Sequence, residues 1–375
     1  MRQAPKGLSI AIGGHATLPA NAVDKSIPVQ EAAMREVFGQ VLTVVRAAVQ
    51  EGFTWNTMTH GSGPQTDLIL KRVRECLKIG MHNLPLYYAS MDLIASIGMT
   101  MERILASMIA REMGCFGADK TGVQTVPTHF LVDPNTMKPV KPIGGTLTEE
   151  EIKILEKLGE TVKDTKDGKG PRIIVASPKV LGVLPQNLDG IVAVIRAGLL
   201  AIAGGTGGVA VTIEEDGEIT PHPAVIDKDY AAEAIVRGLA EKEIPTDTFG
   251  VIMSDPYTVR NFSIVAEGID AAGGPMKVTA EERARLMEAA GPIHRIAAAD
   301  MGAILETPGA VTSGAEPKIR AAWRLVDKKI VRQAIICSPE NFGATFIGKA
   351  KDAGTVIFKG EKWVGSPEIH GQFKA

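Results

Sequence analysis

The glycine-rich segment GGTGGVAV at residues 204–211 is the part of the sequence with the clearest chemical meaning. It follows an apolar run at 191–203 and precedes the segment AVIDKDYAAE at 224–233. Glycine adopts the positive φ angles that turn successive backbone N–H groups toward one side, and such turns bind phosphate. Lys228 lies between two aspartates, which keep its ammonium charged and oriented. The pattern predicts a phosphate-binding turn beside a cation; a simple strand–helix turn beside a surface ion pair is the alternative.

Two further glycine turns follow apolar runs that we interpret as strands, at residues 8–12 and 53–59. In parallel sheets, ligands bind beyond the carboxyl ends of the strands, so both turns are predicted at one edge of a sheet. His60 is adjacent to the second turn, but a lone histidine there is more often structural. The candidate substrate-binding residues of the three turns are Gly13, Gly14, His15, Gly61, Ser62, Gly63, Gly205 and Gly207.

Two other lysines have sequence surroundings that suit anion binding. Lys141 lies between two prolines and before a glycine pair, so it could close over a bound anion on a stiffened loop. Lys318 begins a predicted helix at 315–328, after a glycine and a proline. The alternatives are a solvated loop lysine and an ordinary first-turn residue, although a cation is mildly unfavourable at a helix N-terminus.

The composition excludes several functional classes. The chain has 375 residues, of which 45% are hydrophobic and 22% charged, and its formal net charge is -2. No basic surface for nucleic acid is expected, and the low aromatic content argues against base stacking. Three scattered cysteines indicate neither a disulfide framework nor a zinc site. The histidines show no metal-ligand spacing, so no metal ligands are assigned, and no GxxxxGK[ST] or GxSxG motif is present.

The order of predicted elements indicates an α/β fold with a mainly parallel central sheet between helical layers. Strand, glycine turn and helix alternate at the start of the chain and again after residue 188. This alternation of strand, turn and helix is interrupted at 127–182, where proline, glycine and charged residues are most frequent. This segment is predicted to be an inserted subdomain, with Phe130–Val132 and Ile173–Val175 as a strand pair at its base.

Taken in order, the segments resemble the carbamate kinases of the amino acid kinase family over nearly the whole chain. The matching segments are AIGGHA, THGSGPQ, VDPNTMKPVKPIGG with EEE, SPK, IAGGTGGVAV, AVIDKDYA, VIMSDPYTV, EPKIRAA and AIICSPENFGATFIGKAKDAGTVI. The resemblance implies a kinase that moves a phosphoryl group between ATP or ADP and a small carboxylate-like acceptor, with Mg²⁺. The expected reaction is that of carbamate and carbamoyl phosphate, running toward ATP in the cell.

The resemblance also implies residue roles. Lys141 corresponds to the subdomain lysine that closes over the substrate, Lys228 to the lysine of the VIDKD motif, and Asp227 to the acid that holds it. Lys318 corresponds to the lysine near the nucleotide phosphates. Asp255 and Tyr257 fall in the segment that resembles the nucleotide-side loop, so the assigned catalytic and nucleotide-binding residues are Lys141, Lys228, Lys318, Asp227, Asp255 and Tyr257.

The sequence departs from the family pattern at the acceptor side. His15 and Ser62 stand where carbamate kinases have asparagine, and the GGGGIP run reads GGTGGVAV. Two alternatives to carbamate kinase therefore stay open: a kinase of another small carboxylate or substituted carbamate, and a ligand-binding sensor without turnover.

The resemblance implies one amino acid kinase-like domain over 1–375. Residues 1–200 would form an acceptor-binding lobe that carries the 127–182 subdomain, and 201–375 a nucleotide-binding lobe. A cytoplasmic homodimer that binds small molecules, without nucleic acid or membrane, is expected. The N-terminus lacks the apolar core of a secretory signal, and the most apolar run is too short to span a bilayer.

Overall fold

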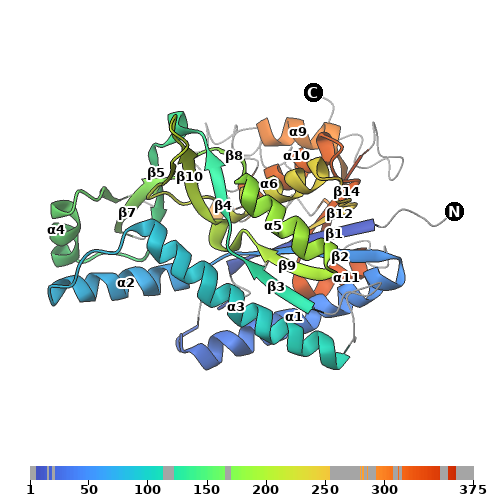
Figure 1. Ribbon diagram of the computed structural model, residues 1–375, viewed down its shortest axis with the longest axis horizontal. Coiled ribbons are helices and arrows are strands. Elements are labelled where there is room, and N and C mark those ends of the chain that lie inside the picture. The colour runs from blue at the N-terminus through green and yellow to red at the C-terminus, as the bar shows by residue number, and fades with distance from the viewer. Residues whose placement is uncertain are drawn as a thin grey trace. The chain divides into compact units, whose positions relative to one another are not determined.

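The computed structural model describes residues 6–14, 17–18, 22–112, 122–164, 170–253, 279, 281–282, 285, 293–306, 311, 315–346 and 354–359 (Figure 1). The chain divides into two compact units; three of the four dividing points lie within β1, α1 and β2, and the fourth follows α6. The first unit consists of Met1–Ala11, Gly39–Asn56 and Glu243–Ala375, and the second of Ile12–Phe38 and Thr57–Lys242.

The largest sheet has eight strands in the order β13-β15-β14-β12-β1-β2-β9-β3. Of the neighbouring pairs with assigned registers, β12–β14, β13–β15, β2–β9 and β3–β9 are parallel, whereas β14–β15 is antiparallel. Helices connect many of these strands along the chain. The mostly parallel sheet with intervening helices confirms the predicted α/β class.

The first unit is built around strands that are buried along nearly their whole length, such as β12, in which all five residues are buried. Its strands and helices are β1 (Lys6–Ile12), the second half of α1 (Ile27–Gln50), the start of β2 (Phe53–His60), β12 (Thr248–Ile252), β13 (Arg295–Ala297), α9 (Ala298–Glu306), α10 (Glu316–Asp327), β14 (Gln333–Cys337), α11 (Pro339–Phe346) and β15 (Gly354–Phe358). Continuous apolar runs of this kind are typical of parallel strands covered on both faces.

The second unit contains the remaining strands of the large sheet, β3 (Gly122–Val126) and β9 (Leu199–Ala203). Its long helices are α2 (Gln65–Lys78), α3 (Leu86–Glu112), α5 (Pro185–Arg196) and α6 (Lys228–Glu241). α3 lies so close to β3 that a Cβ atom on Gly98 would be 2.6 Å from Cγ2 of Thr125. Length and composition alone would let α3 cross a membrane, but half of its apolar window is buried in the protein, as in a core helix.

A four-stranded sheet in the second unit has the order β11-β10-β4-β8. Its strands are β4 (His129–Val132), β8 (Val180–Val183), β10 (Val209–Ile213) and β11 (Ile219–Pro221). β4 pairs in parallel with β10 and antiparallel with β8, so both of its edges are occupied. The predicted pairing of Phe130–Val132 with Ile173–Val175 is therefore wrong.

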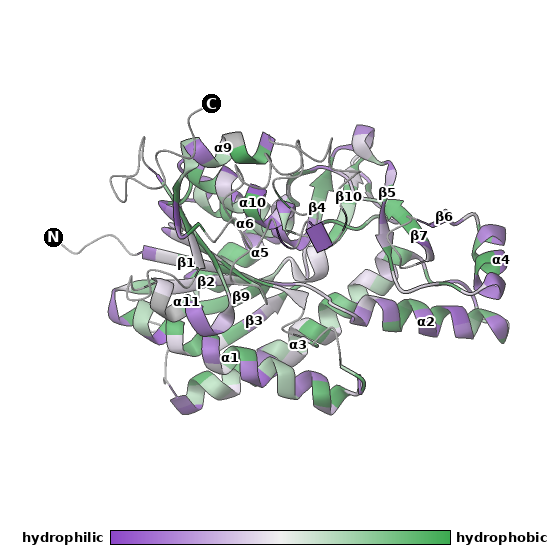
Figure 2. Cartoon of the chain, turned by 180° about the vertical axis from the view of Figure 1, so that it is seen from behind, coloured by the Kyte–Doolittle hydropathy of each residue, from purple (hydrophilic) through white to green (hydrophobic). Residues whose placement is uncertain are grey.

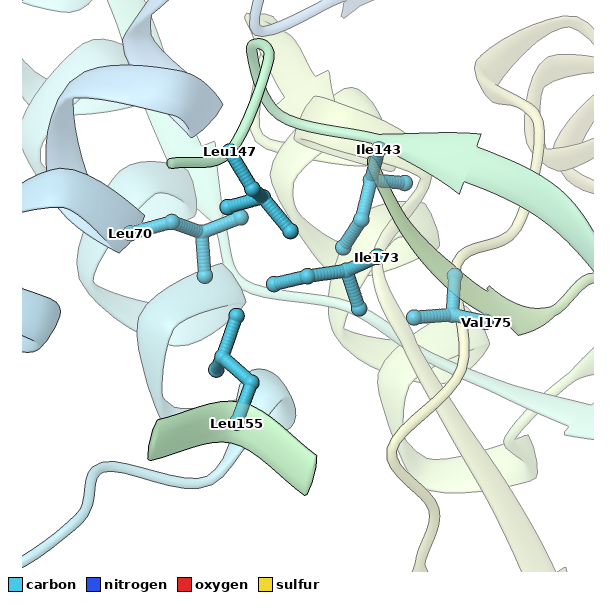
Figure 3. Packing of buried hydrophobic residues seen from close by; sticks show 6 residues of the cluster. All are labelled: Leu70, Ile143, Leu147, Leu155, Ile173 and Val175. Atoms are coloured by element: carbon cyan, nitrogen blue, oxygen red, sulfur yellow. The ribbon is translucent and has the colours of Figure 1, made fainter. Parts of the chain in front are cut away.

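Residues 173–175 belong instead to β7 (Pro171–Ala176), the middle strand of a three-stranded antiparallel sheet with β5 (Pro139–Ile143) and β6 (Val162–Asp164). Helix α4 (Glu149–Lys157) begins with a capping box, in which Thr148 and Glu151 satisfy one another's backbone N–H groups. Six apolar side chains from α2, α4, this sheet and the loop between β5 and α4 point toward one another (Figure 3), namely Leu70, Ile143, Leu147, Leu155, Ile173 and Val175.

Hydrophilic and hydrophobic patches alternate along α2 (Figure 2), as expected of a helix that packs on one side only. The predicted lobes at 1–200 and 201–375, and the predicted insertion at 127–182, differ in their bounds from the two compact units. The assignment of acceptor and nucleotide binding to separate lobes stays a prediction.

Candidate active site

The first two glycine turns touch one another through their backbones in the second unit. Gly61 N donates a hydrogen bond to Ile12 O at 3.0 Å, which joins the end of β2 to the end of β1. A Cβ atom on Gly14 would lie 2.3 Å from Gly63 N, and one on Gly61 would lie 2.8 Å from Gly14 N. Only glycine fits such distances, because the facing atoms are backbone and cannot rotate away.

The third glycine turn follows β9 and packs against the second through His60. A Cβ atom on Gly205 would lie 2.3 Å from His60 Nε2. The turn has positive φ angles at Gly204, Thr206 and Gly207, and Gly204 N donates to Thr128 Oγ1 at 3.1 Å. The three predicted turns are therefore in contact, the first two through their backbones and the third through the side chain of His60.

His60 is the buried side chain through which the third turn contacts the second. Its Nδ1 lies 3.2 Å from Gly61 O, so Nδ1 carries the proton that this carbonyl accepts. Burial lowers the pKa of His60 from 6.5 to about 4; the Gly61 hydrogen bond opposes this, and the charge of Lys228 reinforces it. His60 is therefore neutral near pH 7, and its role at the turns is packing rather than charge.

Helix α6 begins beside these turns and brings two acids and a lysine with it. Asp227 caps the helix, since its Oδ1 accepts a hydrogen bond from Asp229 N at 3.1 Å. Lys228 pairs with Asp229, and both side chains are buried. The Lys228 chain packs against the second turn, because its Cδ lies 3.2 Å from the position of a Cβ atom on Gly61.

Lys141 reaches the same helix from β5. Its Nζ lies 3.3 Å from Asp227 Oδ2, and both side chains are partly exposed. The small sheet is joined to the approach to α6 by a hydrogen bond of 2.9 Å from Val225 N to Ala176 O. Lys141 and Lys228 therefore lie at the start of one helix, although 86 residues separate Lys141 from its partner Asp227.

Gln65, the first residue of α2, forms hydrogen bonds to Thr17, which follows the first glycine turn, and to Gln30 in α1. Its Oε1 accepts a hydrogen bond from Thr17 Oγ1 at 3.1 Å, and its Nε2 donates to Gln30 Oε1 at 3.2 Å. This buried residue was not among the predicted site residues, although it ends the THGSGPQ motif. A buried amide with both ends bonded fixes the position of its neighbours.

The site contains the kinds of group that bind anions, namely glycine turns, a helix N-terminus and lysines. Each lysine is paired with an aspartate, Lys141 with Asp227 and Lys228 with Asp229. The described residues contain no group of three or more His, Cys, Asp or Glu side chains that could hold a metal ion. A cation such as Mg²⁺ would fit here through the phosphates of a nucleotide, since it retains several waters and needs no protein cage.

The structure changes one expected pairing and adds one residue. Lys228 was expected to be held by Asp227, but its ion-pair partner is Asp229, and Asp227 pairs with Lys141. Asp229 was visible in the VIDKD motif, where two acids flank the lysine equally. Because α6 begins at Lys228, Asp227 caps the helix, and Asp229, within the helix, pairs with the lysine.

The remaining predicted residues lie as follows. Ser62 Oγ accepts a hydrogen bond from Thr66 Oγ1 at 2.6 Å. Lys318 lies in the first turn of α10, in the first unit. Three predicted residues lie outside the described residues: His15, Asp255 and Tyr257.

Comparison with known proteins shows similarity to carbamate kinases. The chain is 32% identical over 235 residues to the carbamate kinase of Clostridium perfringens, covering 60% of this chain and 69% of that protein. It is 28% identical over 357 residues to carbamate kinase 1 of Enterococcus faecium, covering 94% and 99%. A solved structure of Giardia lamblia carbamate kinase bound to AMP-PNP aligns over 95% of this chain and 99% of its own, with a TM-score of 0.72 and 24% identity. No family model matches the chain.

Proposed function

Because the chain belongs to the carbamate kinase family, we propose that it transfers a phosphoryl group between ATP and carbamate. In the cell the reaction would run from carbamoyl phosphate and ADP toward ATP and carbamate. The observation that carries the proposal is the meeting of Lys141, Lys228 and the glycine turns at the start of α6. Such a set of donors suits a group whose negative charge is spread over several oxygens.

In the proposed reaction, Lys228 and Lys141 would have different roles. An oxygen of the terminal phosphate of ADP attacks phosphorus, the bond from phosphorus to the carbamate oxygen breaks, and carbamate leaves as an anion. Phosphoryl transfer depends mainly on positioning and on stabilising charge on the equatorial oxygens. Lys228, held by Asp229, would bind these oxygens, and Lys141 would cover them and exclude water. The leaving group needs no proton, so no general acid is required.

The nucleotide side of the proposal rests on fewer described residues. Lys318 would contact the nucleotide phosphates, and Asp255 and Tyr257 would contact the nucleotide, as the resemblance implies. Bound Mg²⁺ would neutralise phosphate charge. The relative crystallised with AMP-PNP supports an ATP-type ligand for this family.

The acceptor is the least constrained part of the proposal. Another small carboxylate or a substituted carbamate is the alternative enzyme, with His15 and Ser62 as the altered residues, and a sensor without turnover is the alternative outside catalysis. The comparisons favour neither alternative. A panel of small acids with ATP, read by ADP release, separates all three, because a sensor would bind ligand calorimetrically without turnover.

We further propose that the protein acts in the cytoplasm as a homodimer on small molecules, with neither nucleic acid nor a membrane as partner. Size-exclusion chromatography with light scattering tests the dimer. A monomer at micromolar concentration would contradict the proposed homodimer but not the proposed phosphoryl transfer.

The decisive experiment mixes the protein with Mg²⁺, ADP and carbamoyl phosphate and measures ATP. We expect ATP formation, and a loss of about 10²-fold or more in kcat/KM for Lys228→Ala, by analogy with the loss of an oxyanion-stabilising donor. Lys163→Ala, which removes an exposed lysine of β6, is the matched control and should keep full activity. An enzyme without ATP formation, or an undiminished Lys228→Ala variant, would contradict the proposal.

A further inference from the structure

The glycine pair Gly144–Gly145, which directly follows β5, is anchored to the first turn of α2. Gly145 N donates a hydrogen bond to Asp67 Oδ1 at 2.7 Å, and both residues are partly buried. Gly144 has a φ of 72°, in the left-handed region that favours glycine, and a Cβ atom there would lie 3.6 Å from Cδ1 of Leu70. Leu70 also packs in one apolar cluster with Ile143, the last residue of β5 (Figure 3). The glycine pair therefore forms a tight turn against α2.

The carboxylate of Asp67 lies closely against the backbone of Gly145. A Cβ atom on Gly145 would lie 3.1 Å from Oδ1 and 3.2 Å from Oδ2, so a side chain at this position would crowd the carboxylate. Hydrogen bonds to an ionised acceptor are shorter and stronger than those between neutral groups. Asp67 also lies in the first turn of α2, where the helix dipole favours a negative charge. Two effects therefore act on one carboxylate, and substitutions can separate them.

The strand that ends at this turn carries Lys141. Lys141 lies four residues before Gly145, so at most about 13 Å of chain separates them, at 3.3 Å per residue. Its Nζ lies 3.3 Å from Asp227 Oδ2 at the start of α6, and the strand between the two points is paired with β7. β5 is thus held at one end by α6 through Lys141 and at the other end by α2 through Gly145.

The helix that carries Asp67 begins at the second glycine turn. Gln65 N donates a hydrogen bond to Ser62 O at 3.2 Å, and Thr66 Oγ1 donates to Ser62 Oγ at 2.6 Å. Asp67 is the next residue along the chain, so a single helical turn connects the second glycine turn to the turn after β5. Lys141 is therefore linked to the glycine turns through α2 as well as through α6.

We propose that Asp67 is a positioning residue for Lys141, because it fixes the turn after β5 to α2 and so holds the strand that presents the lysine. The ion pair of Lys141 with Asp227 is 32% and 21% exposed, and such a pair is too weak to position the lysine by itself. Asp67 would act through Lys141 and would not contact the substrate. Its effect on the reaction rate rests on the proposed phosphoryl transfer, whereas its effect on the strand does not.

The kinetic test compares Asp67→Ala with Asp67→Asn in the formation of ATP from carbamoyl phosphate and ADP. Alanine removes the acceptor of the Gly145 N–H, so we expect kcat to fall about tenfold while KM for ADP is unchanged. Asparagine loses the charge but keeps an acceptor oxygen, and should retain kcat within about twofold. Glu75→Ala, which removes an exposed acid of the same helix, is the control and should keep full activity. Equal losses in the two Asp67 variants would assign the effect to the charge on α2 and overturn the proposal.

A double-mutant cycle identifies the residue through which Asp67 acts. In a protein that already carries Lys141→Ala, the change Asp67→Ala should lower kcat by less than about twofold more, since no ammonium group remains to be positioned. A residue that merely stabilised the fold would lower the activity by the same factor in both backgrounds. Losses that multiply would therefore show that Asp67 does not act through Lys141, and would refute the proposal.

Hydrogen exchange of the full-length protein tests the anchor without turnover. Amides of β5 should exchange about tenfold faster in Asp67→Ala than in the unmutated protein, and at the unmutated rate in Asp67→Asn, while the β12–β14 pair of the first unit stays unchanged in both. If the protein makes no ATP, the proposed phosphoryl transfer fails, but faster exchange in β5 would still support the anchor. Unchanged exchange in β5 of a folded Asp67→Ala protein would overturn the proposal whether or not ATP is made.

Discussion

The two lysine–aspartate pairs at the start of α6 differ in how strongly the fold holds them. Lys228 and Asp229 are 9% and 0% exposed, whereas Lys141 and Asp227 are 32% and 21% exposed. The first pair lies between the helix and the glycine turns, and the second joins the helix to the three-stranded sheet. Buried pairs lose much of their solvation and depend on their partners, whereas exposed pairs contribute little to stability.

This difference suggests a division between a fixed cation and an adjustable one. Lys228 would keep its position whether or not a ligand is bound, because its partner is fully buried and its chain packs on Gly61. Lys141 is free to exchange its contact with Asp227 for a contact with a ligand at little cost. The predictions below test this division and run from the largest expected effect on the free energy of unfolding to the smallest.

Asp229→Asn should have the largest effect. It leaves Lys228 buried opposite a neutral side chain, so the free energy of unfolding should fall by about 3–5 kcal/mol in urea titrations. Asp227→Asn is the matched change at the exposed pair, and since asparagine also caps helices it should cost less than about 1 kcal/mol. Equal losses in the two variants would remove the distinction between the pairs.

The pH dependence of stability should reveal the buried His60. Its pKa falls from 6.5 in the unfolded chain to about 4 in the folded protein, so unfolding takes up a proton between these values. Stability should therefore decrease as the pH falls from about 7 to about 4, by up to about 3 kcal/mol from this residue. His60→Asn should flatten this part of the profile, measured by urea unfolding at several pH values. An unaltered slope in His60→Asn would contradict the assignment.

Gly205→Ala tests the packing of the third turn against His60. The added Cβ would lie 2.3 Å from His60 Nε2, and the buried ring cannot move aside, so we expect a loss of about 1–3 kcal/mol. Gly190→Ala in α5 meets open space and replaces glycine in a helix, so it should stabilise the protein by roughly 0.5–1 kcal/mol. Thermal unfolding of both variants provides the comparison; a Gly205→Ala protein as stable as Gly190→Ala would show that the turn can shift.

Lys141→Ala should have the smallest effect on stability and a large one on activity. The partly exposed pair contributes less than about 1 kcal/mol, so the unfolding curve should change little. ATP formation should nevertheless fall by about 10²-fold in kcat/KM if Lys141 covers the transferring group. Lys163→Ala, on the neighbouring strand β6, is the control for both measurements. A clear loss of stability together with normal turnover would reverse the roles given to the two pairs.

The local elements were largely predictable because their signals are local. The strands predicted at 8–12 and 53–59 fall within β1 and β2, since each run of strand-forming residues leads into a glycine turn. The partners of the strands were not predictable in the same way. β4 pairs with β8 and β10 rather than with β7, and this choice depends on contacts between distant segments that no single run of residues encodes.

Residue types and the family resemblance predicted the glycine turns and the lysines of the site. They did not predict which aspartate pairs with which lysine. Two aspartates flank Lys228, and sequence spacing alone treats them alike. The first turn of α6 distinguishes them, because the cap residue Asp227 faces the backbone and Lys141, while Asp229 lies within the helix. Gln65 was missed because its importance comes from hydrogen bonds to Thr17 and Gln30, which are distant in sequence.

The close packing of the first two glycine turns restricts how this protein could evolve. Any side chain at Gly14 or Gly61 would collide with backbone atoms, so these positions are closed to substitution. Ser62, between two such glycines, directs its hydroxyl to Thr66 and imposes no comparable steric limit on the backbone. Substitutions in the second turn are therefore tolerated between the glycines, at Ser62, while the backbone of the two turns keeps its shape.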